Sequence, residues 1–212
     1  MTEFPYVTGR SALHDRAAVL ATPCPVPDAA GIYAWFFKEV PPRIETAGCF
    51  QFDDLTLLYV GISPKEPPAN GRLPSRSMLR QRLRTHYAGN AEGSTLRRTL
   101  GCLLGDCLGL ELRRVGSGGR YTFTNPGERV LDRWMQDNAF VAWREQPTPW
   151  VTELSILRSG LSLPLNVHGN PNQVMAGVVQ SARSRARRRA DELPIVVDSG
   201  GARRGGVASR LS

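Results

Sequence analysis

The chain has 212 residues, enough for one domain with a buried core and a terminal extension. Its contents of 41% hydrophobic and 22% charged residues are ordinary for a globular protein. No apolar run reaches the ~20 residues needed to cross a bilayer, and the first residues show no secretory signal. We therefore expect a cytoplasmic protein without membrane contact.

Basic residues are concentrated near the C-terminus. The formal net charge is +8, from 27 Lys and Arg against 19 Asp and Glu. From residue 183 onward there are eight Arg against three acidic residues, so this segment holds five of the eight excess charges. Arg binds phosphate through a planar fork, and neutralising phosphates releases counterions, so the cluster favours a phosphate-rich partner. A solvated tail that only aids solubility explains it equally well.

In chain order, the first half alternates buried strands with long connections. Residues 1–28 form an N-terminal extension with a short helical pattern at 11–21. The apolar runs at 30–37 and 55–61 predict two strands, because turn residues bound each run. Residues 38–54 connect them, and a Pro- and Gly-rich loop follows at 62–76.

The second half is mainly helical. Leu79, Leu83 and Tyr87 recur every four residues, which predicts a helix over 77–87 with one apolar face. Ser94 suits the N-cap of a Leu-rich helix over 95–108. Further helices are expected at 126–138, 148–159 and 172–193, with a third strand at 140–144, an extended segment at 163–166 and a disordered Arg/Gly tail at 194–212.

These elements predict an α+β fold: a small three-stranded, mostly antiparallel sheet flanked by helices, followed by a basic C-terminal tail. The main domain is expected at 29–171, with the basic helix at 172–193 outside it.

Polar side chains on these elements suit phosphodiester hydrolysis. Tyr33 and Tyr59 lie on neighbouring strands, so their hydroxyls can converge on one water molecule or on each other. A free Tyr has a pKa of about 10, so a Tyr base needs neighbouring cations or a metal-bound water. Arg82 offers a permanent cation for the scissile phosphate, and His86 on the same helical row can orient phosphate or move a proton. Gly61 ends its strand where the substrate backbone can approach.

Glu153 is the only acidic residue between Pro147 and Val167, and it lies on the apolar side of its helix. A partly buried carboxylate needs a cation or several hydrogen-bond donors. One carboxylate, together with water and substrate phosphate, is a common way to bind Mg²⁺. The placement predicts a metal ligand for Mg²⁺ or Mn²⁺.

The order of these residues resembles the GIY-YIG nuclease family. Gly31-Ile32-Tyr33 and Tyr59-Val60-Gly61 match its two signature tripeptides, with Val for Ile in the second. Arg82, His86, Glu153 and Asn166 follow in the family's order, and the resemblance covers about residues 30–170. It implies a metal-dependent endonuclease acting on nucleic acid, in this case double-stranded DNA. It also implies Glu153 as the metal ligand and Asn166 as a residue whose hydrogen bonds hold the site.

Three more basic residues are candidates for substrate binding. Lys65 follows the second tripeptide, where family members often carry a basic residue, and Arg80 and Arg84 flank Arg82 on the helix. The connection at 38–54 and the loop at 62–76 are insertions relative to compact family members. They are candidates for substrate recognition, or marks of a lineage that lost nuclease activity.

Several alternatives remain open. Taken singly, the two tyrosines fit ordinary strand positions, Arg82 fits a helix surface, and Glu153 fits an ion pair with Arg158 or another Arg. A non-cleaving nucleic-acid-binding protein, or an enzyme of other chemistry, can use the same scaffold.

Overall fold

The computed structural model describes residues 13–68, 77–168, 170 and 172–197. At its centre is a four-stranded antiparallel sheet with the strand order β2-β3-β1-β6. The strands are β1 (Gly31–Phe37), β2 (Gln51–Phe52), β3 (Leu55–Ser63) and β6 (Ala139–Glu145). The predicted α+β fold is confirmed, but the sheet has four strands rather than three. The additional strand, β2, has two residues, too few for an alternating pattern to reveal it.

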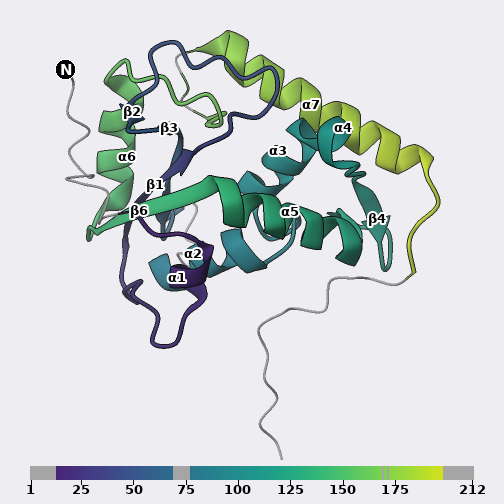
Figure 1. Ribbon diagram of the computed structural model, residues 1–212, viewed down its shortest axis with the longest axis horizontal. Helices are drawn as coiled ribbons and strands as arrows, with labels where there is room; N and C mark the ends of the chain where they lie inside the picture. Colours follow the sequence, from purple (N-terminus) through teal and green to yellow (C-terminus); the bar gives the residue numbers. More distant parts are fainter. Residues whose placement is uncertain (1–12, 69–76, 169, 171, 198–212) are drawn as a thin grey trace, which may run out of the picture.

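Helices cover both faces of the sheet (Figure 1). They are α1 (Arg16–Leu20), α2 (Leu79–Ala88), α3 (Thr95–Leu103), α4 (Gly105–Leu108), α5 (Thr124–Asn138), α6 (Pro149–Arg158) and α7 (Gln173–Glu192). Successive side chains of β1 point to opposite faces. Its even-numbered residues join an apolar cluster with α6, and its odd-numbered residues join a larger cluster with α2, α3, α5 and α7. The residues of the continuous apolar run of β1 therefore pack alternately into two hydrophobic clusters, one on each face of the sheet.

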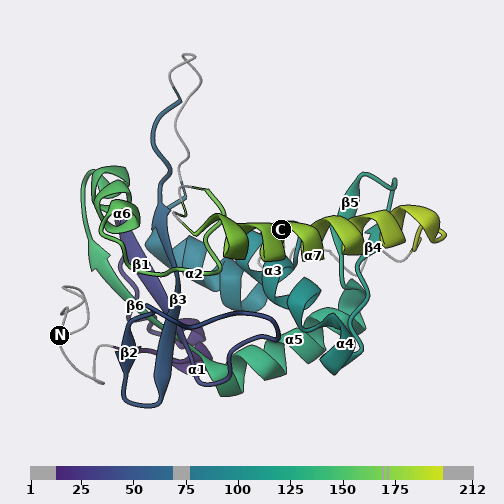
Figure 2. The same ribbon diagram turned by 90° about the horizontal axis from the view of Figure 1, so that it is seen from above.

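The long C-terminal helix α7 packs along α3 and reaches β4 (Figures 1 and 2). One hairpin escaped prediction: β4 (Arg113–Val115) pairs with β5 (Arg120–Thr122). The tail is expected from 194, yet Val196 still bridges to Val115 beside this hairpin. Residues 198–212 of the expected tail lie outside the described residues, as do residues 1–12 and most of the loop at 62–76.

Two helix predictions need correction. The single helix expected at 95–108 is divided at Leu104 into α3 and α4, and α4 ends at Gly109, whose φ of 63° is left-handed. The helix expected from residue 126 begins at Thr124. Among the described helices, none is long and apolar enough to cross a membrane.

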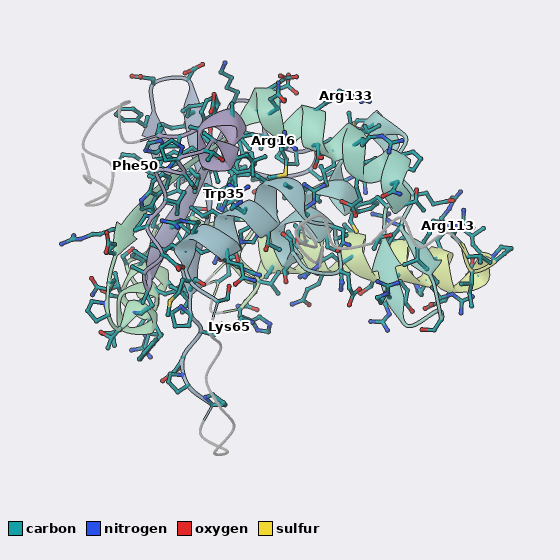
Figure 3. The ribbon with its side chains drawn as sticks, turned by 90° about the horizontal axis from the view of Figure 1, so that it is seen from below. Arg16, Trp35, Phe50, Lys65, Arg113 and Arg133 are labelled. Carbon is teal, nitrogen blue, oxygen red and sulfur yellow. The ribbon has the colours of Figure 1, made fainter. Side chains whose placement is uncertain are left out.

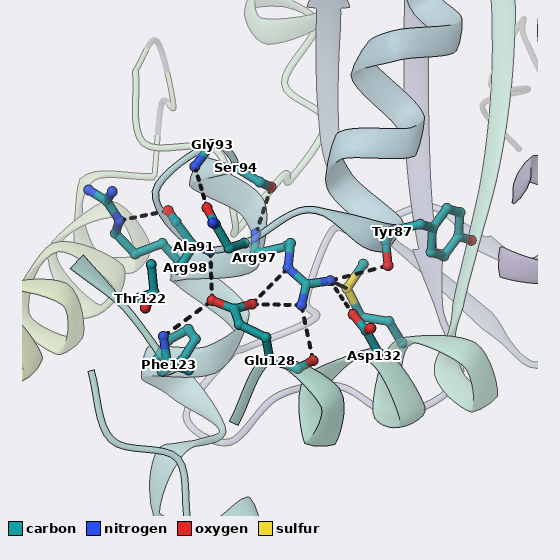
Figure 4. A network of polar contacts seen from close by, with 12 residues as sticks. Tyr87, Ala91, Gly93, Ser94, Arg97, Arg98, Thr122, Phe123, Glu128 and Asp132 are labelled. Atoms are coloured by element: carbon teal, nitrogen blue, oxygen red, sulfur yellow. Dashed lines mark hydrogen bonds and ion pairs between the residues drawn. The ribbon is translucent and has the colours of Figure 1, made fainter. Parts of the chain in front are cut away.

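A buried ion network ties α3 to α5 and α2 (Figure 4). The Arg97 side chain is fully buried, and its Nε and Nη2 donate to Glu128 Oε2 at 3.1 and 2.7 Å. Its Nη1 lies 2.8 Å from Asp132 Oδ1 and also donates to the backbone oxygens of His86 and Tyr87. Arg97 thereby fixes the C-terminal turn of α2, which carries a candidate site residue.

Candidate active site

Tyr33 and Tyr59 share one face of the sheet because Tyr59 lies opposite Trp35, two residues from Tyr33 on β1. The β1–β3 register shifts just beyond this pair, and Leu58 is the extra residue. This bulge changes the face of the preceding residues of β3, so Leu57 packs into the cluster on the opposite side of the sheet. The two ring centroids are 6.5 Å apart.

The two motif glycines are required by close packing. A Cβ atom on Gly61 would lie 2.6 Å from the Tyr33 hydroxyl oxygen. A Cβ atom on Gly31 would collide with the Arg144 carbonyl oxygen and with Leu79. Gly61 was expected to admit the substrate backbone, and in the structure it makes room for the Tyr33 hydroxyl. Its contact with substrate remains a prediction.

A chain of buried hydrogen bonds runs from Tyr33 through His86 to Ser94. The Tyr33 hydroxyl oxygen lies 3.0 Å from His86 Nε2, and His86 Nδ1 lies 2.7 Å from Ser94 Oγ. Ser94 Oγ also accepts the backbone N–H of Arg97 at 3.1 Å. Ser94 Oγ accepts the Arg97 N–H and offers both a proton and a second lone pair to Nδ1, so these contacts are satisfied with the His86 proton on either ring nitrogen. With the proton on Nε2, His86 donates to Tyr33; with the proton on Nδ1, it accepts from the Tyr33 hydroxyl.

Arg82 contacts the same hydroxyl from the α2 surface. Its Nε donates to the Tyr33 hydroxyl oxygen at 3.3 Å, and its Nη1 donates to the Gly93 carbonyl oxygen at 3.3 Å. Arg82 and His86 are four residues apart on α2, so one helical row presents both side chains to Tyr33. A guanidinium that donates to the tyrosine oxygen favours its anionic form.

Burial opposes charge on this cluster in the free protein. It raises the pKa of Tyr33, and Arg82 opposes this by a smaller amount. Burial, helped by Arg82 and Arg97, lowers the pKa of His86 well below its ordinary value of 6.5. Burial also raises the pKa of Tyr59. His86 is therefore neutral and both tyrosines are protonated near neutral pH.

Glu153 approaches the tyrosines from α6. It is half-buried, and its charge raises the pKa of both Tyr33 and Tyr59. Burial raises the pKa of Glu153, and the nearby Lys65 lowers it. Lys65 is exposed, where the loop leaves β3 (Figure 3). Within the described parts of the chain, neither Arg158 nor any other cation lies at ion-pair distance from Glu153.

The Asn166 side chain makes hydrogen bonds to the β3 backbone of the kind that a neighbouring strand would make. Its Oδ1 accepts the Val60 N–H at 2.9 Å, and its Nδ2 donates to the Val60 carbonyl oxygen at 2.8 Å. The adjacent Leu165 N–H donates to the Leu58 carbonyl oxygen at 3.0 Å. These bonds fix the backbone on both sides of Tyr59, so Asn166 acts on the site through the strand.

The structure does not bring Arg80 and Arg84 to this cluster. Arg80 Nε donates to the Val26 carbonyl oxygen at 2.7 Å, and Arg84 Nη1 donates to the Val19 carbonyl oxygen at 3.3 Å. Both guanidinium groups therefore hold the N-terminal segment against α2. A role for them in substrate binding remains a prediction.

Sequence reasoning missed two residues near the cluster. Ser94 was recognised only as a helix cap, and its contact with His86 depends on the turn between α2 and α3. Arg183 lies close enough to Tyr59 to lower its pKa. No local pattern distinguished Arg183 from the other arginines of α7.

Comparison with known families agrees with this geometry. A family model described as the GIY-YIG catalytic domain matches residues 31–189, which is most of the chain. The fold and the matched residues define a nuclease-type domain whose substrate is nucleic acid. The chain belongs to the GIY-YIG family, and the match continues through most of α7. The comparisons with curated proteins and with solved structures found no match.

Proposed function

We propose that this protein is an endonuclease that uses Mg²⁺ or Mn²⁺ to hydrolyse phosphodiester bonds of double-stranded DNA. The observation that carries this proposal is the half-buried Glu153 carboxylate on α6, a helix that packs on β1 and β3; its charge acts on Tyr33 and Tyr59, and it has no ion-pair partner in the described chain. A protein that only binds nucleic acid gains nothing from a carboxylate on a phosphate-facing surface. A metal-dependent nuclease requires one.

The donor set fits a hard divalent cation. Glu153 is the candidate side-chain ligand, and among the described residues it is not part of a group of three or more His, Cys, Asp or Glu side chains that could hold a metal by themselves. Mg²⁺ commonly binds through one or two carboxylates, with water and substrate phosphate completing its shell. When bound, the ion supplies positive charge that stabilises the pentacovalent phosphate and the leaving oxygen.

Arg82 and Tyr33 divide the remaining chemistry. Arg82 stays charged and presents its guanidinium to the scissile phosphate beside the tyrosine hydroxyl. In the reaction Tyr33 would act as the phenolate, with His86 and Arg82 donating hydrogen bonds to its oxygen, and the positive charge of Arg82 and of a bound cation would offset the effect of burial on its pKa. The phenolate accepts a proton from the attacking water, the water oxygen forms a bond to phosphorus, the bond to the leaving sugar oxygen breaks, and that oxygen takes its proton from a solvent water. The role of Tyr59 is to share this face and orient the water.

Cleavage of a supercoiled plasmid tests the proposal. We expect purified protein to convert the plasmid to nicked or linear forms with Mg²⁺ or Mn²⁺, and excess chelator to stop the reaction. Tyr33→Phe is the matched control, because it keeps the ring and removes only the hydroxyl. Binding of the plasmid without cleavage under every metal condition would favour the non-cleaving alternative.

A further inference from the structure

The helix α7 presents two different flanks to the rest of the molecule. One flank carries Arg185 and Arg189 along the groove between α7 and α3–α4, where Arg189 pairs with Glu111 at 2.8 Å. The other flank carries Arg183 and Arg187, four residues apart on one helical row. The flanks therefore differ in which partners their arginines meet.

Arg183 lies on the site side of α7. It is half-buried on a helix that packs against α3, and burial together with the positive charge of Arg98 lowers its pKa. In the described chain no acidic side chain lies within ion-pair distance of it. A partly desolvated cation close to a second cation is unfavourable, and an anion bound from solution would offset this cost.

The turn between α2 and α3 lies between the candidate site and the part of α3 on which α7 packs. Arg82 donates to the Gly93 carbonyl oxygen, and Arg98 donates to the Ala91 carbonyl oxygen at 3.0 Å, so one turn holds both guanidinium groups (Figure 4 shows Gly93, Ala91 and Arg98). The turn between α2 and α3 therefore links Arg82 of the candidate site to Arg98 of α3.

Glu92 and Tyr121 extend the same surface to the hairpin. Glu92 Oε2 accepts from Arg98 Nη2 at 3.0 Å and from the Tyr121 N–H at 2.9 Å. The Arg187 guanidinium lies over the Tyr121 ring, 4.7 Å from its centroid. Arg187 is thus held on the same surface as Arg98 without being neutralised by a carboxylate in the described chain.

We infer that Arg183 and Arg187 form a phosphate-binding track that holds the nucleic-acid backbone next to the scissile bond. The two α7 residues are separated by about 6 Å along the helix axis, which suits contacts with separate phosphates of one strand. The track rests on the proposed function, because it locates the same substrate beyond the bond that is cut. It also gives α7 a specific role in place of a diffuse basic surface.

Salt-dependent binding of a DNA duplex tests the track. Binding is measured by fluorescence anisotropy over a range of KCl, with the full chain carrying Glu153→Gln so that no cleavage interferes. Arg183→Gln and Arg187→Gln should each weaken binding about tenfold and reduce the slope of log affinity against log salt by ~0.9. Arg185→Gln and Arg188→Gln remove the same charge from the same helix, and we expect at most a small change for each.

Equal effects of all four substitutions, or no effect of Arg183→Gln and Arg187→Gln, would overturn the track. The outcome is separable from that of the proposed function. Flank-specific binding by a chain whose wild-type form never cuts DNA would support the track and contradict the nuclease. Cleavage by the wild type together with flank-independent binding would do the reverse.

Discussion

Two polar regions lie next to each other in this protein and differ in how their charges are compensated. Around Arg97, two arginines meet two carboxylates: Arg97 pairs with Glu128 and Asp132, and Arg16 lies 3.3 Å from Asp132. Around Tyr33, the charged groups Arg82 and Glu153 have no ion-pair partner in the described chain. Charged groups that are paired within the protein are typical of a structural network. Charged groups without such a partner are available to bind a ligand of opposite charge.

The two regions are nevertheless physically joined. Arg97 donates to the His86 carbonyl oxygen, and its backbone N–H donates to Ser94 Oγ, the same oxygen that contacts the His86 ring. The rigid network therefore holds the residue that contacts Tyr33. A mutation in one region should lower stability, and a mutation in the other should lower activity.

The largest expected effect on stability is that of Arg97→Met. This substitution leaves the Glu128 carboxylate buried without its cation and removes one of the two arginines beside Asp132, which should lower the free energy of unfolding by about 3–5 kcal/mol. Urea unfolding followed by circular dichroism measures it. Arg98→Met, which loses a half-exposed pair with Glu92, is the control and should cost less than about 1 kcal/mol for that pair. Equal losses of unfolding free energy in the two variants would mean that burial does not determine how much an ion pair contributes to stability.

Arg82→Ala should lower the cleavage rate about a hundredfold while leaving stability nearly unchanged. The mutant loses a charge-assisted contact to the phosphate, worth about 3 kcal/mol in the transition state. Arg80→Ala and Arg84→Ala are matched controls on the same helix, because their guanidinium groups bind carbonyl oxygens of the N-terminal segment. Single-turnover rates that fall equally in all three variants would indicate a diffuse basic surface instead.

Ser94→Ala should lower the cleavage rate by about tenfold, because His86 loses the hydroxyl that can donate to its Nδ1 and so keep the ring proton on Nε2, the form that donates to a Tyr33 phenolate. The variant also loses the N-cap of α3, which costs about 1 kcal/mol of stability. Asn172→Ala removes the N-cap of α7 and controls for that cost. Nitrogen-15 NMR of the His86 ring should show a changed tautomer in Ser94→Ala. An unchanged tautomer together with an unchanged rate would remove Ser94 from the site.

Acid should destabilise the protein through His86. Its pKa is depressed in the folded state, so below pH 6.5 the unfolded chain binds a proton that the folded chain does not, and stability falls as pH falls. Between about pH 7.5 and about pH 5.5 this should cost about 1 kcal/mol. His86→Gln should lose less stability than the wild type over this range, whereas His168→Gln, at an exposed position, should follow the wild type.

Local sequence patterns predicted the parts of the molecule that depend on local chemistry. The apolar runs predicted β1, β3 and β6, and the signature tripeptides pointed to the family whose catalytic-domain model matches residues 31–189. The order of polar residues placed Tyr33, Arg82 and His86 together, and the structure brings them within hydrogen-bond distance. Strand burial and helical periodicity produce patterns of apolar residues within short segments, so they can be predicted from the sequence.

Features set by distant contacts were not predictable in the same way. The Leu58 bulge depends on the register between β1 and β3, and the contact of Asn166 with Val60 joins residues 106 apart in the chain. The division between α3 and α4 depends on how Leu104 and Gly109 pack and turn, against the helical pattern of their leucines. The position of Arg183 beside Tyr59 follows from the packing of α7 on α3. None of these leaves a periodic signal.

Single-turnover cleavage of a DNA duplex by Glu153→Gln tests the central claim most directly. The amide keeps the size of the side chain and removes the charge that would hold the divalent ion. We expect the rate with saturating Mg²⁺ to fall by about a thousandfold or more. Duplex binding and the free energy of unfolding without metal should be at least as favourable as in the wild type, because a half-buried carboxylate with a raised pKa is being removed. Cleavage at the wild-type rate, or a marked loss of stability, would show that Glu153 is a structural residue and would contradict the account.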